Sequence, residues 1–472
     1  MKRKTKIVCT IGPAVDNDEM IAALIKTGMN VARLNFSHSD YDEHRRRIAR
    51  IKKIAAKLNR HIAIMADTKG PEIRTGIFEE GGVYYHKNDI VFVLKNEVIG
   101  TKEHFSINYP GNFNNIKVGD YLLIDDGKIR MEVTATETDA LKCTVRNPGL
   151  IKSRKGINIP NNKMNIPFIS QKDREDIIFA AKNDVDLIAA SFVQSVNDIE
   201  DIRTLLKSCR RENIEIIAKI ENQQALNDLD VILSATDGIM VARGDLGVEI
   251  AAEAVPVYQK KIIQKANELG KPVITATHML ESMITFPRPT RAEVSDIANA
   301  VLDGTDAVML SGETAVGAYP IEAVRMMDLI TKATEKIYPY EEYLQKSIKS
   351  SEKTINDAIG ISVARTALTL PPVGAIVAFT ETGGTAKRMC KYRPSVPIIA
   401  VTDNIAAAKR LTYYWGVFPV IQKTVTDITE YNQIANTVAR NFGLPPGTMI
   451  IITSGWGQIH GRTNNLSIIT LA

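Results

Sequence analysis

Cysteine is scarce in this chain of 472 residues, which has four cysteines and no C-x-x-C spacing. This excludes a disulfide-stapled scaffold and a structural zinc site, and it favours a reducing, cytoplasmic environment. No apolar run approaches the length of a transmembrane helix, and the run behind Met1–Lys4 is too short for a signal peptide. A strong charge of one sign is also missing, because 59 Lys and Arg stand against 54 Asp and Glu. A net charge of +5 suits small anionic ligands at least as well as nucleic acid, so we expect neither a nucleic-acid nor a membrane partner.

What the chain does contain is an alternation of short, β-branched apolar runs with amphipathic stretches, which is typical of a parallel sheet. Eight such runs predict strands at Lys6–Ile11, Asn30–Asn35, Ile62–Asp67, Asp186–Phe192, Glu215–Glu221, Gly238–Ala242, Pro272–Thr277 and Asp306–Leu310. Helix-like runs follow most of them, for example Asp18–Thr27, Asp40–Leu58, Val196–Arg211 and Tyr258–Leu269. Eight strand–helix units predict a (β/α)8 TIM barrel over residues 1–70 and 168–342, with an active site where the strands end.

Two other parts of the chain have a different character. Residues 71–167 predict a small inserted β-barrel domain, placed to act as a lid, from the short alternating runs Val91–Leu94, Tyr121–Ile124, Lys128–Val133 and Lys142–Val145. A polar, lysine-rich linker is expected at Tyr343–Lys353. A second α/β pattern then predicts an open-sheet C-terminal domain over residues 343–472, with strands near Ala375–Phe379, Ile398–Val401, Val417–Ile421, Met449–Ile452 and Leu466–Leu471.

Polar side chains gather at the predicted strand ends. In the run Ile214–Asn222, Lys219 and Glu221 are two residues apart and therefore share one face of the strand. Taken alone, such a pair is most often a surface ion pair. Other strand ends are equally polar, with Arg33, Asn35, Ser37, Asp67, Thr68, Asp245, Thr277, Ser311 and Glu313. Since all strand ends of a barrel meet at one mouth, the sequence predicts that these residues form one site.

The chemistry of this set favours a divalent cation and a phosphorylated ligand. Glu221 and Asp245 are two carboxylates that leave coordination sites for water and substrate, which suits Mg²⁺ or Mn²⁺. Asp245 is equally suited to cap a helix that begins beside Gly244. Lys219 offers a positive charge to an enolate or a transferring phosphoryl group. Spacing alone assigns no second cation site to the oxygen-rich set of Asn35, Ser37, Asp67 and Thr68.

Phosphate ligands have weaker signals. Arg33 ends a strand and Arg74 begins the insertion, although a lone arginine is more often a surface residue. The segment Thr380–Thr385 follows a strand and opens a helix, which suits a phosphate, but an ordinary turn is the default interpretation. From these residues alone, we expect a Mg²⁺-dependent barrel enzyme acting on a phosphorylated or enolisable anion.

Literal strings extend this expectation. They are Thr10–Pro13, Asn30–His38, Asp67–Arg74, Lys155–Asn158, Lys219–Asn222, Ala242–Gly247, Met279–Met283 and Ser311–Ala315. With all of them in this order, the chain resembles the pyruvate kinases over essentially its whole length. The resemblance implies transfer of a phosphoryl group from phosphoenolpyruvate to ADP, then protonation of the enolate to pyruvate, the last step of glycolysis.

The resemblance also implies roles by position. Glu221 and Asp245 would hold Mg²⁺, and Lys219 would stabilise the transferring group. Thr277 and Ser311 stand where the family passes a proton, through water, to the enolate carbon. The remaining roles are phosphoryl or substrate binding by Arg33, Gly244, Asp245 and Thr277, nucleotide binding by Arg74 and Lys155 with His38 nearby, and K⁺ binding by Asn35, Ser37, Asp67 and Thr68. Glu72 marks family members that need K⁺, so we expect K⁺ activation.

The chain departs from the family pattern at two positions near the predicted site. His278 stands where many members have glutamine, and Val316 where many have lysine. The resemblance implies a homotetramer and a C-terminal effector site for a small phosphorylated molecule, built from Thr380, Thr382, Thr385 and the tail around Trp456. Glu381 replaces a lysine found in some sugar-bisphosphate-activated members, and a carboxylate repels phosphate at short range. We therefore expect weak or absent activation by fructose 1,6-bisphosphate, with AMP or a sugar monophosphate still open.

Two other classes of function share part of this residue pattern. A Mg²⁺-dependent lyase or aldolase also needs an enolate-stabilising site, but it has no use for nucleotide-binding residues such as Lys155 and Arg74. A non-catalytic sensor of phosphorylated metabolites has no use for Lys219, Glu221 and Asp245. ADP-dependent formation of pyruvate separates both classes from the expected enzyme.

Overall fold

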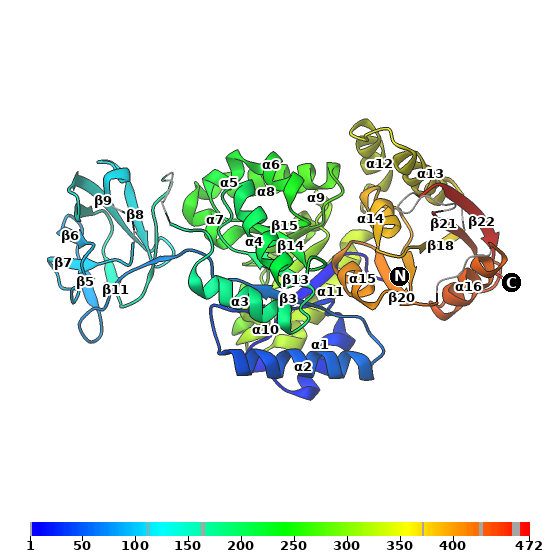
Figure 1. The fold of residues 1–472 in the computed structure, drawn as a ribbon, viewed down its shortest axis with the longest axis horizontal. Helices are drawn as coiled ribbons and strands as arrows, with labels where there is room; N and C mark the ends of the chain where they lie inside the picture. The colour runs from blue at the N-terminus through cyan, green and yellow to red at the C-terminus, as the bar shows by residue number, and fades with distance from the viewer. Residues whose placement is uncertain are drawn as a thin grey trace.

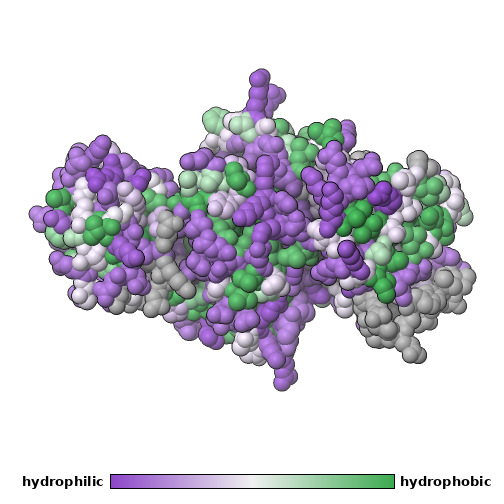
Figure 2. Space-filling view, turned by 90° about the horizontal axis from the view of Figure 1, so that it is seen from above, coloured by the Kyte–Doolittle hydropathy of each residue, from purple (hydrophilic) through white to green (hydrophobic). Residues whose placement is uncertain are grey.

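Three bodies lie in a row in the computed structural model, with an all-β lid at one end, a barrel in the centre and an α/β domain at the other end (Figure 1). The structure describes residues 2–109, 111, 113–160, 162, 166–370, 372–423, 428–455 and 463–472. In the described part of the chain, no helix is long and apolar enough to cross a membrane. Hydrophilic and hydrophobic side chains are intermixed on the face shown in Figure 2, so no single apolar face dominates this view.

The central body is a closed barrel of eight parallel strands, in the order β1-β17-β16-β15-β14-β13-β3-β2. All eight predicted strands are confirmed, as β1 (Lys6–Thr10), β2 (Val31–Asn35), β3 (Ala63–Asp67), β13 (Leu187–Ala190), β14 (Glu215–Ile220), β15 (Gly238–Ala242), β16 (Val273–Ala276) and β17 (Ala307–Leu310). Their burial is nearly complete because helices cover the outside and side chains fill the inside.

Alternation along each strand separates two apolar layers. In β14, Ile217 packs in the same cluster as Met65 and Met240, whereas Ile216 and Ala218 pack with helix residues. Because side chains two residues apart share a face, Lys219 follows Ile217 towards the barrel axis. The barrel interior is thus apolar along its length and charged at the carboxyl end of β14.

Helices surround the barrel. They are α1 (Asp18–Thr27), α2 (Tyr41–Lys57), α3 (Gln171–Lys182), α4 (Val196–Ser208), α5 (Gln223–Asn227), α6 (Leu229–Ala235), α7 (Arg243–Glu249), α8 (Val255–Glu268), α9 (Arg291–Asp303), α10 (Gly312–Ala315) and α11 (Pro320–Glu335). Side-chain caps start several of them, such as Asn17 for α1 and Asp40 for α2. Ser170 and Thr290 each form a reciprocal capping box.

The lid is a seven-stranded sheet of order β4-β12-β8-β9-β10-β6-β7 together with the two-stranded ribbon β11-β5. An isolated bridge between Thr75 and Ile107 joins the chain just after the two edge strands, so the sheet nearly closes around one apolar core. Four predicted strands are confirmed as β6 (Ile90–Leu94), β8 (Tyr121–Ile124), β9 (Ile129–Thr136) and β10 (Ala140–Val145). Five short strands were not predicted: β4 (Ile73–Arg74), β5 (Val83–Tyr85), β7 (His104–Ser106), β11 (Gly149–Ile151) and β12 (Gly156–Asn158).

The C-terminal domain is an open sheet of order β20-β19-β18-β21-β22, parallel except for β22. The five predicted strands are confirmed as β18 (Val373–Phe379), β19 (Ile398–Thr402), β20 (Val417–Ile421), β21 (Met449–Ser454) and β22 (Asn465–Thr470). The helices of this domain are α13 (Ile355–Thr369), α14 (Gly384–Lys391), α15 (Ile405–Arg410) and α16 (Ile428–Asn441).

One prediction for this region is wrong. The expected linker at Tyr343–Lys353 is largely helix α12 (Tyr340–Lys349). Its buried Leu344 packs against Tyr392, and Ile348 joins the same small cluster one turn later. This i, i+4 apolar pair buries one face of α12 and holds the helix against the domain.

Polar bonds fix the C-terminal domain to the amino ends of the barrel strands. Glu215, the first residue of β14, accepts a hydrogen bond from the Tyr413 hydroxyl at 2.6 Å. Asp306, just before β17, lies 2.9 Å from Arg393 Nη2 and accepts a bond from the Trp415 backbone N–H at 3.2 Å. Since the C-terminal domain covers the amino ends, the carboxyl ends of the strands face the lid (Figure 1).

Candidate active site at the carboxyl ends of the strands

Two cations and two carboxylates from the ends of β2, β3 and β14 meet inside the barrel mouth. Arg33 Nε donates to Asp67 Oδ2 at 2.6 Å, and Lys219 Nζ lies 3.2 Å from Asp67 Oδ1. Lys219 Nζ also lies 2.8 Å from Glu221 Oε1, so the predicted common face of these two residues is confirmed. All four side chains are buried, and Glu221 has no exposed surface at all. The Lys219–Glu221 pair is therefore not a surface ion pair.

Charge compensation inside this cluster shows in the pKa values. Burial on its own would raise the pKa of Asp67, but Arg33 and Lys219 outweigh it and hold that pKa below its usual value. Burial likewise disfavours the Lys219 cation, yet the Asp67 and Glu221 carboxylates raise its pKa above the usual value. Lys219 is therefore a permanent positive charge in a site of low dielectric constant, where a charge acts most strongly.

Glu221 is the least satisfied member of the cluster. Burial raises its pKa to about 7, Lys219 opposes that rise and Asp245 adds to it. Its Oε2 accepts the Phe192 backbone N–H at 2.6 Å, whereas Oε1 is buried and accepts no hydrogen bond of acceptable geometry. The Lys219 ammonium, 2.8 Å away, compensates the charge of this oxygen, but its hydrogen-bonding capacity is not used, which leaves it able to accept a further cation ligand.

The residues present fit a divalent cation that keeps water and substrate ligands. Glu221 Oε1 accepts no hydrogen bond, and Asp245 lies in the first turn of α7, the helix that follows β15. Within the described residues, no group of three or more His, Cys, Asp and Glu side chains is arranged to bind a metal. A closed protein cage of that kind is absent there, and a hard cation such as Mg²⁺ needs only one or two carboxylates.

The oxygen-rich set beside Arg33 lies on two neighbouring strands. Asn35 and Asp67 are register partners at the ends of β2 and β3. The Asn35 side chain accepts the Ser37 backbone N–H at 3.1 Å, which holds the following turn, and Thr68 directly follows Asp67. These side chains are all hard oxygen donors, which fits an alkali cation.

Thr277 and Ser311 end the neighbouring strands β16 and β17. Thr277 Oγ1 accepts the Gly244 backbone N–H at 2.8 Å, which ties the end of β16 to the start of α7. Ser311 Oγ is buried and has no hydrogen-bond partner. An unpartnered hydroxyl at the mouth of a barrel is costly, so its retention there is typical of a functional position.

The candidate nucleotide residues of the lid are already paired with carboxylates. Arg74 Nη2 lies 2.6 Å from Glu72 Oε2, and Lys155 Nζ lies 2.8 Å from Asp125 Oδ1. Both cations remain about one third exposed, at 35% and 36% of the side chain. His38 is exposed on the loop after β2, apart from the charged cluster. The three residues therefore flank the mouth and contribute no bond to the buried cluster.

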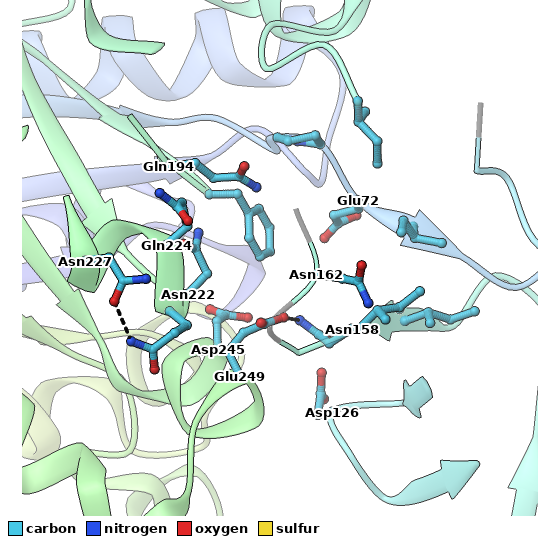
Figure 3. Close-up of a pocket in the computed structure, with 18 residues that line it drawn as sticks. Glu72, Asp126, Asn158, Asn162, Gln194, Asn222, Gln224, Asn227, Asp245 and Glu249 are labelled. Carbon is cyan, nitrogen blue, oxygen red and sulfur yellow. Dashed lines mark hydrogen bonds between the residues drawn. The ribbon is translucent and has the colours of Figure 1, made fainter. Parts of the chain in front are cut away.

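A cavity of about 250 Å³ separates the lid from the barrel mouth. Figure 3 shows Glu72, Asp126, Asn158 and Asn162 on its lid side and Gln194, Asn222, Gln224, Asp245 and Glu249 on its barrel side. The candidate metal ligand Asp245 lines the cavity, as does Asn222, which follows Glu221 in the chain.

One hydrogen bond spans this cavity at its edge. Asn158 Nδ2, in β12 of the lid, donates to Glu249 Oε1, at the end of α7, at 2.7 Å. Apart from the Lys69–Glu72 ion pair at the hinge, it is the one side-chain bond between lid and barrel among the described residues. The position of the lid thus depends on few polar contacts.

Sequence reasoning missed three residues of the site. Ser191, just after β13, accepts a bond from Lys219 Nζ at 2.7 Å and donates to the Thr68 carbonyl at 2.7 Å. Phe192 supplies the N–H that holds Glu221. Arg243 contacts the end of β16 through two backbone carbonyls. Ser191 and Phe192 are the last two residues of the predicted strand Asp186–Phe192. Their position at a strand end is the same signal that identified the other site residues.

The C-terminal loop has the geometry of a tight turn. Thr380 Oγ1 accepts the backbone N–H groups of Gly383 at 3.0 Å and Thr385 at 3.4 Å, while Gly383 adopts a φ of 99°. Thr385 Oγ1 lies 3.1 Å from Thr463 Oγ1, so the loop meets the tail, and Thr382 lies between these contacts. Trp456 lies outside the described residues.

Comparison with known proteins decides the family. The family described as pyruvate kinase, barrel domain, matches residues 2–324, and the pyruvate kinase alpha/beta domain matches residues 357–469. The chain belongs to the pyruvate kinase family. A pyruvate kinase of Geobacillus stearothermophilus is 50% identical over 458 residues, which cover 96% of this chain and 78% of the relative. Those of Staphylococcus haemolyticus and Staphylococcus aureus (strain MRSA252) are 50% and 48% identical, covering 98% and 99% of this chain and 80% of each relative.

The family result confirms the expected fold and activity. The barrel, the inserted lid and the C-terminal α/β sheet are those of a pyruvate kinase. The activity of the chain is phosphoryl transfer from phosphoenolpyruvate to ADP, which gives pyruvate and ATP. The lyase, aldolase and sensor alternatives are thereby set aside.

Proposed function

We propose that the buried cluster at the end of β14 performs the phosphoryl transfer. Lys219 stabilises the negative charge of the transferring group, and Arg33 contacts the phosphoryl oxygens. Glu221 and Asp245 hold Mg²⁺ or Mn²⁺, which supplies charge neutralisation to the phosphoryl oxygens when it is bound. The observation that carries this proposal is the buried Lys219–Glu221 pair, in which Glu221 Oε1 contacts the Lys219 cation but accepts no hydrogen bond.

Substrate orientation falls to residues at the start of α7 and the end of β16. Gly244, Asp245 and Thr277 bind the carboxylate end of phosphoenolpyruvate. Support comes from the 2.8 Å bond between the Gly244 N–H and Thr277 Oγ1, because it places these groups within reach of one ligand. Thr277 and the unpartnered Ser311 pass a proton, through water, to the enolate carbon after phosphoryl transfer.

Nucleotide binding falls to the lid. Arg74 and Lys155 exchange their present partners, Glu72 and Asp125, for the phosphates of ADP, and His38 lies near the nucleotide. Support comes from their one-third exposure, since a partly hydrated ion pair contributes little and exchanges readily. The lid then excludes water from the transferring group.

A monovalent cation completes the site. Asn35, Ser37, Asp67 and Thr68 hold K⁺ with hard oxygen donors. Both oxygens of Asp67 already accept bonds from Arg33, Lys219 or Ser191, so K⁺ shares this carboxylate with the catalytic cluster. We therefore expect K⁺ to order the same residues that carry the reaction.

One coupled assay tests these proposals together. Pyruvate formation is measured with ADP, Mg²⁺ and K⁺ and after omission of each component in turn. We expect loss of activity without ADP or Mg²⁺ and strong loss when Na⁺ replaces K⁺. Full activity in K⁺-free buffer would refute the K⁺ site, and activity without a divalent cation would refute the roles of Glu221 and Asp245.

Assembly and regulation are further proposals. The chain forms a homotetramer in the cytoplasm, with domain limits at residues 1–70 and 168–342, 71–167, and 343–472. The presence of four free cysteines supports the reducing compartment. The effector site lies at Thr380, Thr382, Thr385 and Trp456, and Glu381 makes activation by fructose 1,6-bisphosphate weak or absent. A large fall in the half-saturating phosphoenolpyruvate concentration on adding the bisphosphate would overturn this.

A further inference from the structure

Two consecutive residues at the barrel mouth adopt left-handed backbone conformations. Thr277 has a φ of 67° and His278 a φ of 54°. This region is unfavourable for residues other than glycine, and most of all for a β-branched residue such as threonine. Such a conformation persists only where surrounding contacts impose it. The contacts that hold Thr277 are therefore part of how the site is built.

Arg243 supplies those contacts. Its Nη2 donates to the Thr277 carbonyl at 2.6 Å, and its Nε donates to the Ala276 carbonyl at 3.3 Å. Because the guanidinium is planar, one rigid group fixes two successive carbonyls. Arg243 is also the first residue of α7, so the same residue joins the end of β16 to the helix that carries Gly244.

The guanidinium is itself held from behind. Arg243 Nη1 donates to Asp296 Oδ1 in α9 at 2.7 Å and to Gln259 Oε1 in α8 at 3.4 Å. The Arg243 side chain is only 9% exposed, whereas Asp296 is 35% exposed, so the guanidinium is buried and its carboxylate partner is half-buried. Gln259 in turn donates to Asp303 at 3.0 Å. The guanidinium group therefore cannot rotate away without breaking its hydrogen bonds to α8 and α9.

The left-handed Thr277 has a direct consequence for the reaction. In this conformation Thr277 Oγ1 accepts the Gly244 N–H at 2.8 Å, next to the groups assigned to the substrate carboxylate. If Thr277 relaxed to the extended region, its carbonyl and its side chain would rotate away from these positions. A misplacement of about 1 Å in a reacting group costs on the order of 100-fold in rate.

We propose that Arg243, backed by Asp296, is a positioning residue for protonation of the enolate, acting through Thr277. The inference rests on the proton-passing role proposed for Thr277. In that step a C–H bond forms at the methylene carbon and the enolate oxygen becomes the keto carbonyl, while an O–H bond of a bridging water breaks. The Thr277 hydroxyl gives its proton to that water and regains one from solvent. Phosphoryl transfer at Lys219 is complete by then, and it uses Thr277 only to bind the substrate carboxylate.

The test separates the two half-reactions in an Arg243→Lys variant of the full-length enzyme. Lysine keeps the charge but has one nitrogen, which cannot hold both carbonyls. Exchange of the pyruvate methyl protons with D₂O, followed by ¹H NMR, reports the proton step. ATP formation from phosphoenolpyruvate and ADP reports phosphoryl transfer. We expect the exchange to fall about 10-fold or more at saturating substrate and the rate of ATP formation to fall much less, while the KM for phosphoenolpyruvate rises because Thr277 also binds the substrate carboxylate.

The chain offers a matched control at the opposite end of the barrel. Arg203 Nη2 also donates to a backbone carbonyl, Ala235 O at 2.7 Å, and to a carboxylate, Asp237 Oδ2 at 3.0 Å. Arg203→Lys should leave both rates unchanged. Asp296→Asn keeps an acceptor but removes the charge that anchors the guanidinium group, so it should produce a smaller selective loss of exchange if Arg243→Lys does not fold.

Three outcomes contradict the inference. A parallel fall of exchange and ATP formation would reduce Arg243 to a structural residue, and unchanged exchange in both the Arg243 and the Asp296 variants would remove its role. Thr277→Ala distinguishes the level of failure. If it too leaves the exchange intact, the proton-passing role of Thr277 fails and the inference with it. If it abolishes exchange while Arg243→Lys does not, only the positioning role fails.

Discussion

Replacing Lys219 with methionine tests the centre of the site. The change removes one charge from a buried cluster in which Arg33 and Lys219 balance Asp67 and Glu221, so the cluster passes from neutral to a net charge of −1. Methionine has a similar length and packs well in irregular apolar space. Arg33 still pairs with Asp67, and the Phe192 N–H still holds Glu221, so the shape of the mouth is retained.

The expected magnitude follows from the burial of Lys219. Removal of one preorganised donor from a transition-state site costs about 10²–10³ in kcat, or ~3–4 kcal/mol. Lys219 carries a full charge and is only 8% exposed, so we expect a loss of about 10³-fold or more. Binding of Mn²⁺, measured by electron paramagnetic resonance, and of phosphoenolpyruvate, measured by calorimetry, should persist because the metal carboxylates and Arg33 remain.

A control separates loss of charge stabilisation from loss of structure. Lys172 also pairs with a fully buried carboxylate, that of Asp176, but on the outer helix α3. Lys172→Met also leaves a buried carboxylate without its cation and should keep turnover near normal, with a smaller loss of stability because Lys172 is 46% exposed. Near-normal turnover of Lys219→Met, or loss of its metal and phosphoenolpyruvate binding with turnover, would refute the division of roles between Lys219 and Glu221.

Three other predictions follow from separate parts of the molecule. Asn158→Ala and Glu249→Ala each remove the hydrogen bond between lid and barrel and should raise the KM for ADP about 5–10-fold. Glu249→Gln keeps the acceptor oxygen and should leave this KM unchanged. Equal effects of the two Glu249 variants would show that this hydrogen bond does not hold the lid. Burial lowers the pKa of His44 to about 4. Below about pH 6.5 this imidazole is therefore protonated in the unfolded chain but still neutral in the folded chain, so the folded state loses stability as the pH falls. Between pH 7.5 and 5.0 the wild type should lose about 2 kcal/mol more unfolding free energy than His44→Gln, and parallel urea-unfolding profiles would contradict this. Replacing K⁺ with tetramethylammonium should lower kcat strongly, and Asp67→Asn should weaken the response of kcat to added K⁺; an unchanged K⁺ response would argue against Asp67 as a ligand.

Much of the fold could be predicted because one physical rule repeats. Each barrel strand is buried on both faces, so it appears as an apolar run of four to six residues before a helix-like stretch. The short lid strands gave no such signal: β4 has two residues and β12 three, and pairing across the sheet defines them. In α12 the charged residues drew the interpretation as a linker, although Leu344 and Ile348 have helical spacing.

The site divides in the same way. Lys219 and Glu221 were found because their spacing fixes a common face and both lie at a strand end. Arg243 was not found, because its role depends on carbonyls that come near only when β16 ends in a left-handed turn. Backbone conformation of that kind is imposed by tertiary contacts, and no local pattern of residue types records it.

Strand β14 shows why the C-terminal domain belongs to the support of the site. Its first residue, Glu215, accepts bonds from Tyr413 and Lys387 of that domain, and the other end of the strand leads directly to Lys219 and Glu221. Between these ends the strand is fully buried and pairs in register with β13 and β15. A close-packed strand is stiff, so the bonds to Glu215 help to fix the position of the whole strand. Helix α14, which carries Lys387, begins at Gly384 within the Thr380–Thr385 segment, so the same helix forms part of the proposed effector site and contacts the first residue of the strand that carries Lys219.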